Sequence, residues 1–122
     1  MADRSPQDRL RRKSERGFQG YPLATVAFYG PDNRLASKVA VGIVRRDGGD
    51  VDVMEKWLSE ASDVRDDATV TTQILEFVHR HDAKSVVIGP GILGCPHEEG
   101  IDYPLGQACP KCPYWAGRPR PI

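Results

Sequence analysis

The sequence predicts an α+β domain that ends in a segment rich in cysteine and proline. Before residue 60, short runs of strand-forming residues alternate with turn residues. An amphipathic helical pattern follows over residues 70–81, and a last apolar run occupies residues 85–88. A strand that follows a helix usually joins the existing sheet. We therefore expect an antiparallel three-strand meander, one helix and a fourth strand in a single mixed sheet.

Residues 1–20 are expected to form a disordered basic arm. Residues 1–17 hold six basic and three acidic residues, and Leu10 is the one apolar residue in the stretch 9–13. Such a segment buries too little apolar surface to offset the entropy that is lost on ordering. Its cations, with two arginines near the other end of the chain, are candidates for contact with nucleic acid. These candidates are Arg9, Arg11, Arg12, Lys13, Arg118 and Arg120.

Three strands are predicted before the helix. Residues 24–29 are apolar and rich in strand formers, and a Gly-Pro-Asp-Asn turn follows them. Residues 38–44 are apolar at both alternating sets of positions, so this strand is expected to be covered on both faces. After a Gly-rich turn, residues 51–57 alternate as a third strand does, although a short helix also fits them.

The helix follows a polar loop at residues 59–66. Asp66 and Asp67 stand where a helix favours an N-cap and first-turn acids. Apolar residues then recur at the helical period, and the helix is expected to end near His81. A three-residue link leads to the strand at 85–88, which is expected to end at the following Gly-Pro-Gly.

Composition and charge exclude several functional classes. The 17 basic and 17 acidic residues balance, so the protein as a whole lacks the positive charge typical of a nucleic-acid-binding domain. No apolar run approaches the roughly 20 residues that span a membrane. Residues 1–20 also lack the apolar stretch of a secretion signal. We therefore expect a cytoplasmic protein without a membrane partner, in which thiols stay reduced.

All three cysteines and one histidine lie between residues 95 and 112. The two residues within the CxxC unit let both sulfurs turn toward one point, and the loop before it is long enough to fold back. A Cys3His set in tetrahedral geometry is typical of a structural zinc site. Thiolates with an imidazole favour zinc over magnesium or calcium. The expected ligands are Cys95, His97, Cys109 and Cys112.

Glu98 and Glu99 leave a second function open. We expect them to be solvated or to orient His97 through hydrogen bonds. In a metal-dependent hydrolase, three of the four ligands and a water would bind the metal, and either glutamate would act as general base. An iron–sulfur cluster, or a redox pair formed by Cys109 and Cys112, is a further alternative.

Two other patterns bear on the cluster. Zinc deaminases carry H-x-E followed by P-C-x-x-C. Here Ala108 precedes Cys109, and only nine residues separate Glu99 from Cys109, so deamination is disfavoured.

Tyr114 and Trp115 are expected to fold over the metal site and shield it, although aromatic side chains at this place can also stack on a base.

Parts of the chain resemble known proteins. The CPxC unit resembles the knuckles of zinc ribbons. The block CPHEEGIDYPLGQACPKCPYW is similar to a segment of short bacterial proteins of uncharacterised function, which favours a bacterial cytoplasmic setting. The element order over residues 22–92 resembles the first half of the ribonuclease H-like fold. Nucleases of that family carry acids where this chain has ATVAFY and SVVIGPG, so the resemblance implies no nuclease activity.

These patterns divide the chain into a disordered basic arm (1–20), an α+β core (21–94) and a zinc-binding tail (95–122). The predicted function is that of a small zinc-binding protein with a structural metal site. Its predicted role is a binding module for protein or nucleic acid. An enzyme is the less favoured interpretation, because the sequence carries no catalytic signature.

Overall fold

The computed structural model describes residues 5–59 and 62–116. Its helices are α1 (Pro6–Glu15) and α2 (Ala68–Arg80), and its strands are β1 (Leu23–Tyr29), β2 (Lys38–Val44), β3 (Val51–Leu58) and β4 (Ser85–Ile92). Two short 3₁₀ turns, η1 and η2, span Val64–Asp66 and Pro113–Trp115. The strands form one mixed sheet in the order β3-β2-β1-β4, in which β4 runs parallel to β1 and the other neighbours are antiparallel. The predicted α+β fold is therefore confirmed.

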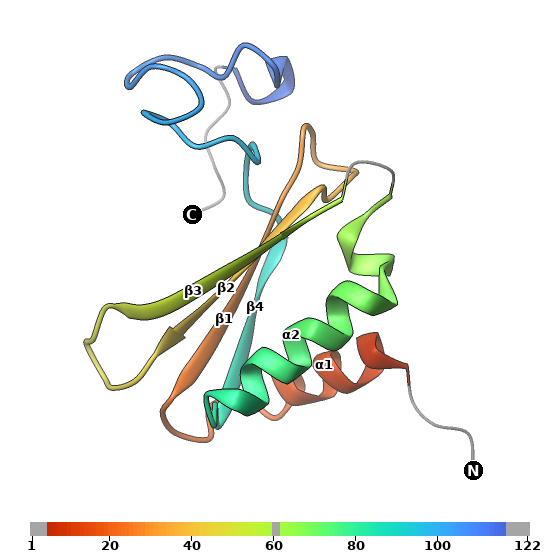
Figure 1. Cartoon of the computed structure of the whole chain (residues 1–122), viewed down its shortest axis with the longest axis vertical. Helices are drawn as coiled ribbons and strands as arrows, with labels where there is room; N and C mark the ends of the chain where they lie inside the picture. Colours follow the sequence, from red (N-terminus) through yellow and green to blue (C-terminus); the bar gives the residue numbers. More distant parts are fainter. Residues whose placement is uncertain (1–4, 60–61, 117–122) are drawn as a thin grey trace.

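Both helices lie on one face of the sheet (Figure 1). Alternate residues of β1 point toward the helices, and α2 packs Ile74 and Phe77 against them. Burial of each large apolar side chain contributes roughly 1.5–3 kcal/mol, so this layer is the main source of stability. The buried core includes Leu10, Val26, Val41, Ile43, Val64, Val70, Ile74, Phe77 and Val86.

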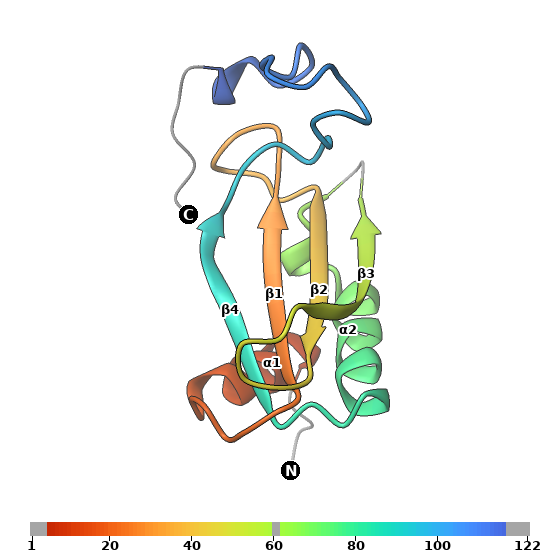
Figure 2. The ribbon, with the colours of Figure 1, turned by 90° about the vertical axis from the view of Figure 1, so that its left-hand side faces the viewer.

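The second face of the sheet carries no helix within the described chain (Figure 2). All of β2 except Val44 is nevertheless buried. Gly42 is covered by a side chain of the edge strand, because a Cβ there would lie 2.9 Å from Val51 Cγ1. At the other end of the strand, the Lys38 ammonium donates to Pro96 O in the segment after β4. Strand β2 is therefore buried on both faces as expected, but neighbouring side chains and a loop cover its second face instead of a layer of helices.

Residues 6–15 form a helix where we expected part of a disordered arm. Ser5 caps this helix by accepting a hydrogen bond from the Asp8 N–H at 3.1 Å, and Pro6 stands in its first turn. Leu10 is only 5% exposed and belongs to the core, where α1 packs beside α2 and β4. One well-placed apolar side chain therefore orders a segment whose composition is that of a disordered arm.

The other elements follow the predictions with one extension. Asp67 caps α2 with its side chain, as its position predicted. Strand β4 does not end at Gly89 but continues to Ile92 with a register shift against β1. Gly91 has a φ of +62°, which favours glycine and permits such a bulge. Neither described helix combines the length and the apolar character that crossing a bilayer requires.

Candidate metal centre

The segment that follows β4 folds over the end of the sheet (Figures 1 and 2). At its start, Leu93 N–H donates to Phe28 O at 2.8 Å, and Gly30 N–H donates to Gly94 O at 2.9 Å. Near its end, the indole N–H of Trp115 donates to Gly30 O at 2.8 Å. Both ends of the segment are therefore fixed near the last residues of β1, and the cysteines lie between them. We call residues 93–116 the metal segment.

The four predicted ligands meet within this segment. The ligand atoms of Cys95, His97, Cys109 and Cys112 all lie within 4.8 Å of one another and can hold a metal ion. His97 Nδ1 is 3.3 Å from the Cys95 sulfur and 3.4 Å from each of the other two sulfurs. One ring nitrogen offers a single lone pair or a single N–H, so it cannot bond three sulfurs at once. The near-equal distances indicate that all four atoms face one common point.

The distances fit the edges of a tetrahedron around one ion. With bond lengths typical of zinc, a sulfur–nitrogen edge is about 3.6 Å and a sulfur–sulfur edge is about 3.8 Å. The three sulfur–nitrogen distances of 3.3–3.4 Å are close to the expected sulfur–nitrogen edge. The sulfurs lie within 4.8 Å of one another, which is compatible with the expected sulfur–sulfur edge. A cluster of several irons distributes its ligands over different iron atoms and so holds them further apart. The geometry therefore suits a single ion better than a cluster.

Tight turns bring backbone N–H groups against the sulfurs. His97 N–H donates to the Cys95 sulfur at 3.3 Å. The Cys112 N–H closes the turn by donating to Cys109 O at 3.4 Å, and the Lys111 N–H lowers the pKa of the Cys109 thiol. Hydrogen bonds of this kind stabilise a thiolate, which is the form of cysteine that binds a metal.

Burial makes three neighbouring thiolates costly unless a cation accompanies them. Burial raises the pKa of Cys95, and it raises the pKa of Cys112 to about 12. Burial also opposes ionisation of Cys109, but hydrogen bonds led by the Lys111 N–H hold the pKa of this thiol below its ordinary value. A metal ion removes the cost, because a coordinating thiol is deprotonated outright. The charge arrangement therefore suits a cation at the centre of the four ligands.

The two glutamates beside the cluster bond to groups other than His97. Glu98 forms ion pairs with Lys56 and, at 3.7 Å, with Lys38. The hydrogen bond from Lys56, followed by the charges of both lysines, lowers the pKa of Glu98. Glu99 accepts a hydrogen bond from Gly106 N–H at 2.7 Å. Within the described residues neither carboxylate bonds the histidine ring, so the expected orienting role is not seen.

Trp115 connects the metal segment to the rest of the protein. Its ring packs against the cysteine cluster and also against the main core. The Tyr114 ring meets it edge to face, with centroids 4.9 Å apart. The predicted shielding of the site by an aromatic side chain is confirmed for Trp115.

A cleft of about 650 Å³ lies between the metal segment and the ends of β2 and β3. Leu35 and Leu58 line its sheet side, while His97 and Cys112 line its metal side. The charged residues around it are Lys38, Lys56, Lys111, Glu98 and Asp102. Sequence reasoning missed these lysines, because they are far apart along the chain and belong to no motif.

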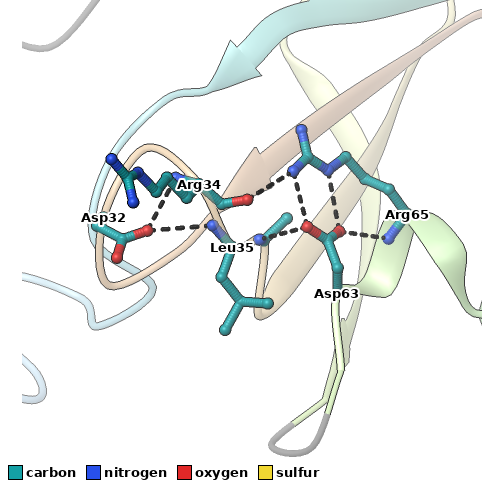
Figure 3. Close-up of polar contacts among 6 residues, drawn as sticks. Asp32, Arg34, Leu35, Asp63 and Arg65 are labelled. Carbon is teal, nitrogen blue, oxygen red and sulfur yellow. Dashed lines mark hydrogen bonds and ion pairs between the residues drawn. The ribbon is translucent and has the colours of Figure 1, made fainter.

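A polar network holds the β1–β2 loop that forms one wall of this cleft (Figure 3). The Asp63 carboxylate accepts Ala36 N–H at 3.0 Å and two hydrogen bonds from the Arg65 guanidinium at 2.9 and 2.7 Å. Arg65 also donates to Arg34 O at 3.1 Å, and Asp32 accepts hydrogen bonds at the tip of the loop. Burial opposes ionisation of Asp63, but these donors, led by Arg65, lower its pKa to about 2. This network was not foreseen from the sequence.

Four of the predicted nucleic-acid contacts lie away from the metal segment. Arg9, Arg11, Arg12 and Lys13 are on α1, at the far end of the molecule (Figure 2). Arg118 and Arg120 lie outside the described residues. The structure therefore separates the four residues that can hold a metal ion from the candidate nucleic-acid contacts on α1.

Comparison with known proteins assigns no family. No family model, curated protein or solved structure matches the chain. The resemblances to zinc-ribbon knuckles, to short bacterial proteins and to the ribonuclease H-like fold stay predictions.

Proposed function

We propose that the metal segment binds one zinc ion through Cys95, His97, Cys109 and Cys112, and that this zinc is structural. The observation that carries the proposal is the position of His97 Nδ1, which is 3.3–3.4 Å from all three sulfurs. Three thiolates with one imidazole favour zinc over harder cations. Bound zinc would compensate the thiolate charge and join the two halves of the segment.

A structural role has more support than hydrolysis. Four protein ligands fill the tetrahedral shell of zinc, whereas a catalytic zinc keeps one position for water. One of the two candidate general bases is also poorly suited, because the two lysine partners of Glu98 hold its pKa below its usual range. The Cys109–Cys112 pair belongs to the same four-ligand set, so its use as a redox pair would compete with metal binding.

The function that follows is that of a binding module for protein or nucleic acid. A metal that only holds a segment in place matters because of the surface that the segment forms. Here the segment closes one side of the 650 Å³ cleft, whose other side is the end of the sheet. Leu35 and Leu58 are exposed on its sheet side, and exposed apolar residues rimmed by charged groups support a partner-binding surface.

The test is metal content combined with the optical spectrum of the cobalt-substituted protein. We expect close to one zinc per chain, and we expect Co²⁺ to give the intense absorption of a tetrahedral thiolate site. His97→Asn should weaken binding and change the cobalt spectrum, whereas His79→Asn on α2 is the matched control and should change neither. Iron with visible colour, or free thiols without metal, would contradict the proposal.

A further inference from the structure

Helix α1 has two flanks with different electrostatics. On one flank, Arg11 pairs with Asp8 at 2.8 Å and with Glu15 at 3.0 Å. The other flank carries four cations, and none of them forms an ion pair with another residue in 5–59 or 62–116. These cations are Arg9, Arg12, Lys13 and Arg16. With 3.6 residues per turn, they occupy one continuous strip of the helix surface.

The strip is fixed in position by the core. Leu10 is buried beneath α1, so the helix cannot rotate without exposing it. After the helix, Gln19 N–H donates to Ser85 Oγ at 2.7 Å, and the Gln19 amide donates to Arg16 O at 2.9 Å. The cations are therefore presented by a docked helix and not by a solvated tail.

A second segment of the chain adds to this charge. A cavity of about 380 Å³ lies where the end of α1 meets the start of β4, and its lining within the described chain includes no acidic residue. Lys84 contributes the third cation, and its backbone N–H is held by Pro22 O at 2.8 Å. The lining residues are Lys13, Arg16, Gln19, Ala83, Lys84 and Val86. We call Arg9, Arg12, Lys13, Arg16 and Lys84 the basic surface.

An exposed aromatic ring adjoins the basic surface. Phe18 is 62% exposed and lies in the chain between Arg16 and Gln19, both of which line the cavity. The Tyr21 ring packs edge to face against it, with centroids 5.1 Å apart, and leaves much of the ring open. Cations that track a phosphate backbone, beside an aromatic ring on which a base stacks, are the usual components of a single-strand binding site.

We propose that this end of the protein binds single-stranded nucleic acid, with phosphates on the basic surface and a base stacked on Phe18. The inference goes beyond the proposed role of the metal segment, because it adds a second binding surface with its own partner. It requires no residue of the metal centre, because the two sites lie at opposite ends of the sheet (Figure 2).

The spacing of the cations favours a polyanion over a single phosphate. Residues 9 to 16 extend over about 10 Å of helix, which is more than one phosphate group contacts. A helix that lies in a membrane surface turns its apolar side outward, toward the lipid. The apolar residue of α1 points inward instead, since Leu10 belongs to the core.

The experiment is fluorescence anisotropy of the full chain with a labelled oligo(dT) of about 12 nucleotides, a length within the site sizes of single-strand binders. Titrations at several salt concentrations between about 50 and about 200 mM give the salt slope. For single strands, each lost phosphate contact reduces the magnitude of this slope by about 0.7. We expect Arg12→Ala and Arg16→Ala each to weaken binding and to reduce the slope by about that amount. Phe18→Ala should weaken binding about fivefold or more with an unchanged slope.

Arg11→Ala is the matched control: the sequence placed this arginine among the candidate contacts, but the structure pairs it with two carboxylates, so it is not part of the basic surface. It should leave the affinity close to that of the wild type. Absence of binding at low salt, equal loss in the Arg11 and Arg12 variants, or preference for anionic vesicles over the oligonucleotide would overturn the proposal. Zinc content, measured on the same preparations, separates the two proposals: a wild-type protein that retains zinc but does not bind the oligonucleotide refutes the nucleic-acid site alone.

Discussion

The sheet with its helices and the metal segment are held together in different ways. The sheet and helices share many buried apolar side chains, of which Phe77 and Ile74 are each 2% exposed. In the metal segment, by contrast, Ile101 and Leu105 are each 77% exposed, and the buried cluster consists of three cysteines and Tyr103. In the first region many apolar contacts share the stability, whereas in the second the proposed metal ion would supply most of it. The two regions should therefore fail separately and for different reasons.

Removal of one metal ligand is the change with the largest expected effect. Structural zinc sites have binding free energies of about 10 kcal/mol or more, and this energy orders the segment that supplies the ligands. In Cys112→Ser we expect zinc to be lost and the amides of residues 95–112 to exchange rapidly with solvent. The amides of β1 and β2 should stay protected. Hydrogen exchange followed by mass spectrometry measures both regions together.

The same experiment tests whether the two regions unfold independently. Chelation of the wild-type protein should reproduce the result, and added zinc should reverse it. If strands and metal segment lose protection together, the two regions form one cooperative unit and the division between them is wrong.

Truncation of the core tests the other region. Phe77→Ala should lower the free energy of unfolding by about 3–5 kcal/mol, because it removes a buried ring and leaves a cavity. The folded protein should still bind zinc with unchanged stoichiometry. Denaturant unfolding followed by circular dichroism gives the stability, and Val87→Ala, at a residue that is 51% exposed, is the control that should change it little. Loss of zinc from the folded variant would contradict the expected independence.

Acid should weaken the network between the β1–β2 loop and the start of α2. The pKa of Asp63 falls from 3.8 to about 2 on folding, so its carboxylate stabilises the native state at pH values above its unfolded pKa. This contribution is about 2 kcal/mol, and it is lost as the pH falls through the interval between those two values. In Asp63→Asn the stability difference from wild type should therefore shrink as the pH is lowered. A difference that does not vary with pH over this interval would show that Asp63 has an ordinary pKa.

The smallest expected effect concerns the link between the two regions. Trp115→Phe keeps an aromatic ring on the cysteine cluster but removes the hydrogen bond to Gly30 O. We expect opening of the metal segment to become easier by about 1 kcal/mol, with no change in global unfolding. Local hydrogen exchange of residues 95–112 measures this. An equal change in both regions would mean that Trp115 belongs to the core rather than to the link.

Local patterns predicted the helices and strands well where the apolar residues that form the pattern are also the ones that are buried. The stripe from Val70 to Val78 is buried along one side of α2, and the three strands pair as a meander because short turns join them. The pattern failed for α1, since a single apolar residue carries almost no periodic signal. Leu10 orders that helix only because α2 and β4 offer a place to bury it.

The four residues that can hold a metal ion could be named from sequence because their chemistry is rare and their spacing is short. Four thiol and imidazole groups within one loop have few uses other than binding a metal. The sequence by itself thus determined the strands, the second helix and the residues that can bind the ion. The tertiary structure alone decided which cations within residues 5–59 and 62–116 lack an ion-pair partner there, and it placed Lys38 and Lys56 beside the metal segment. Those outcomes depend on groups from distant parts of the chain, and no local pattern records how such groups meet when the sheet forms.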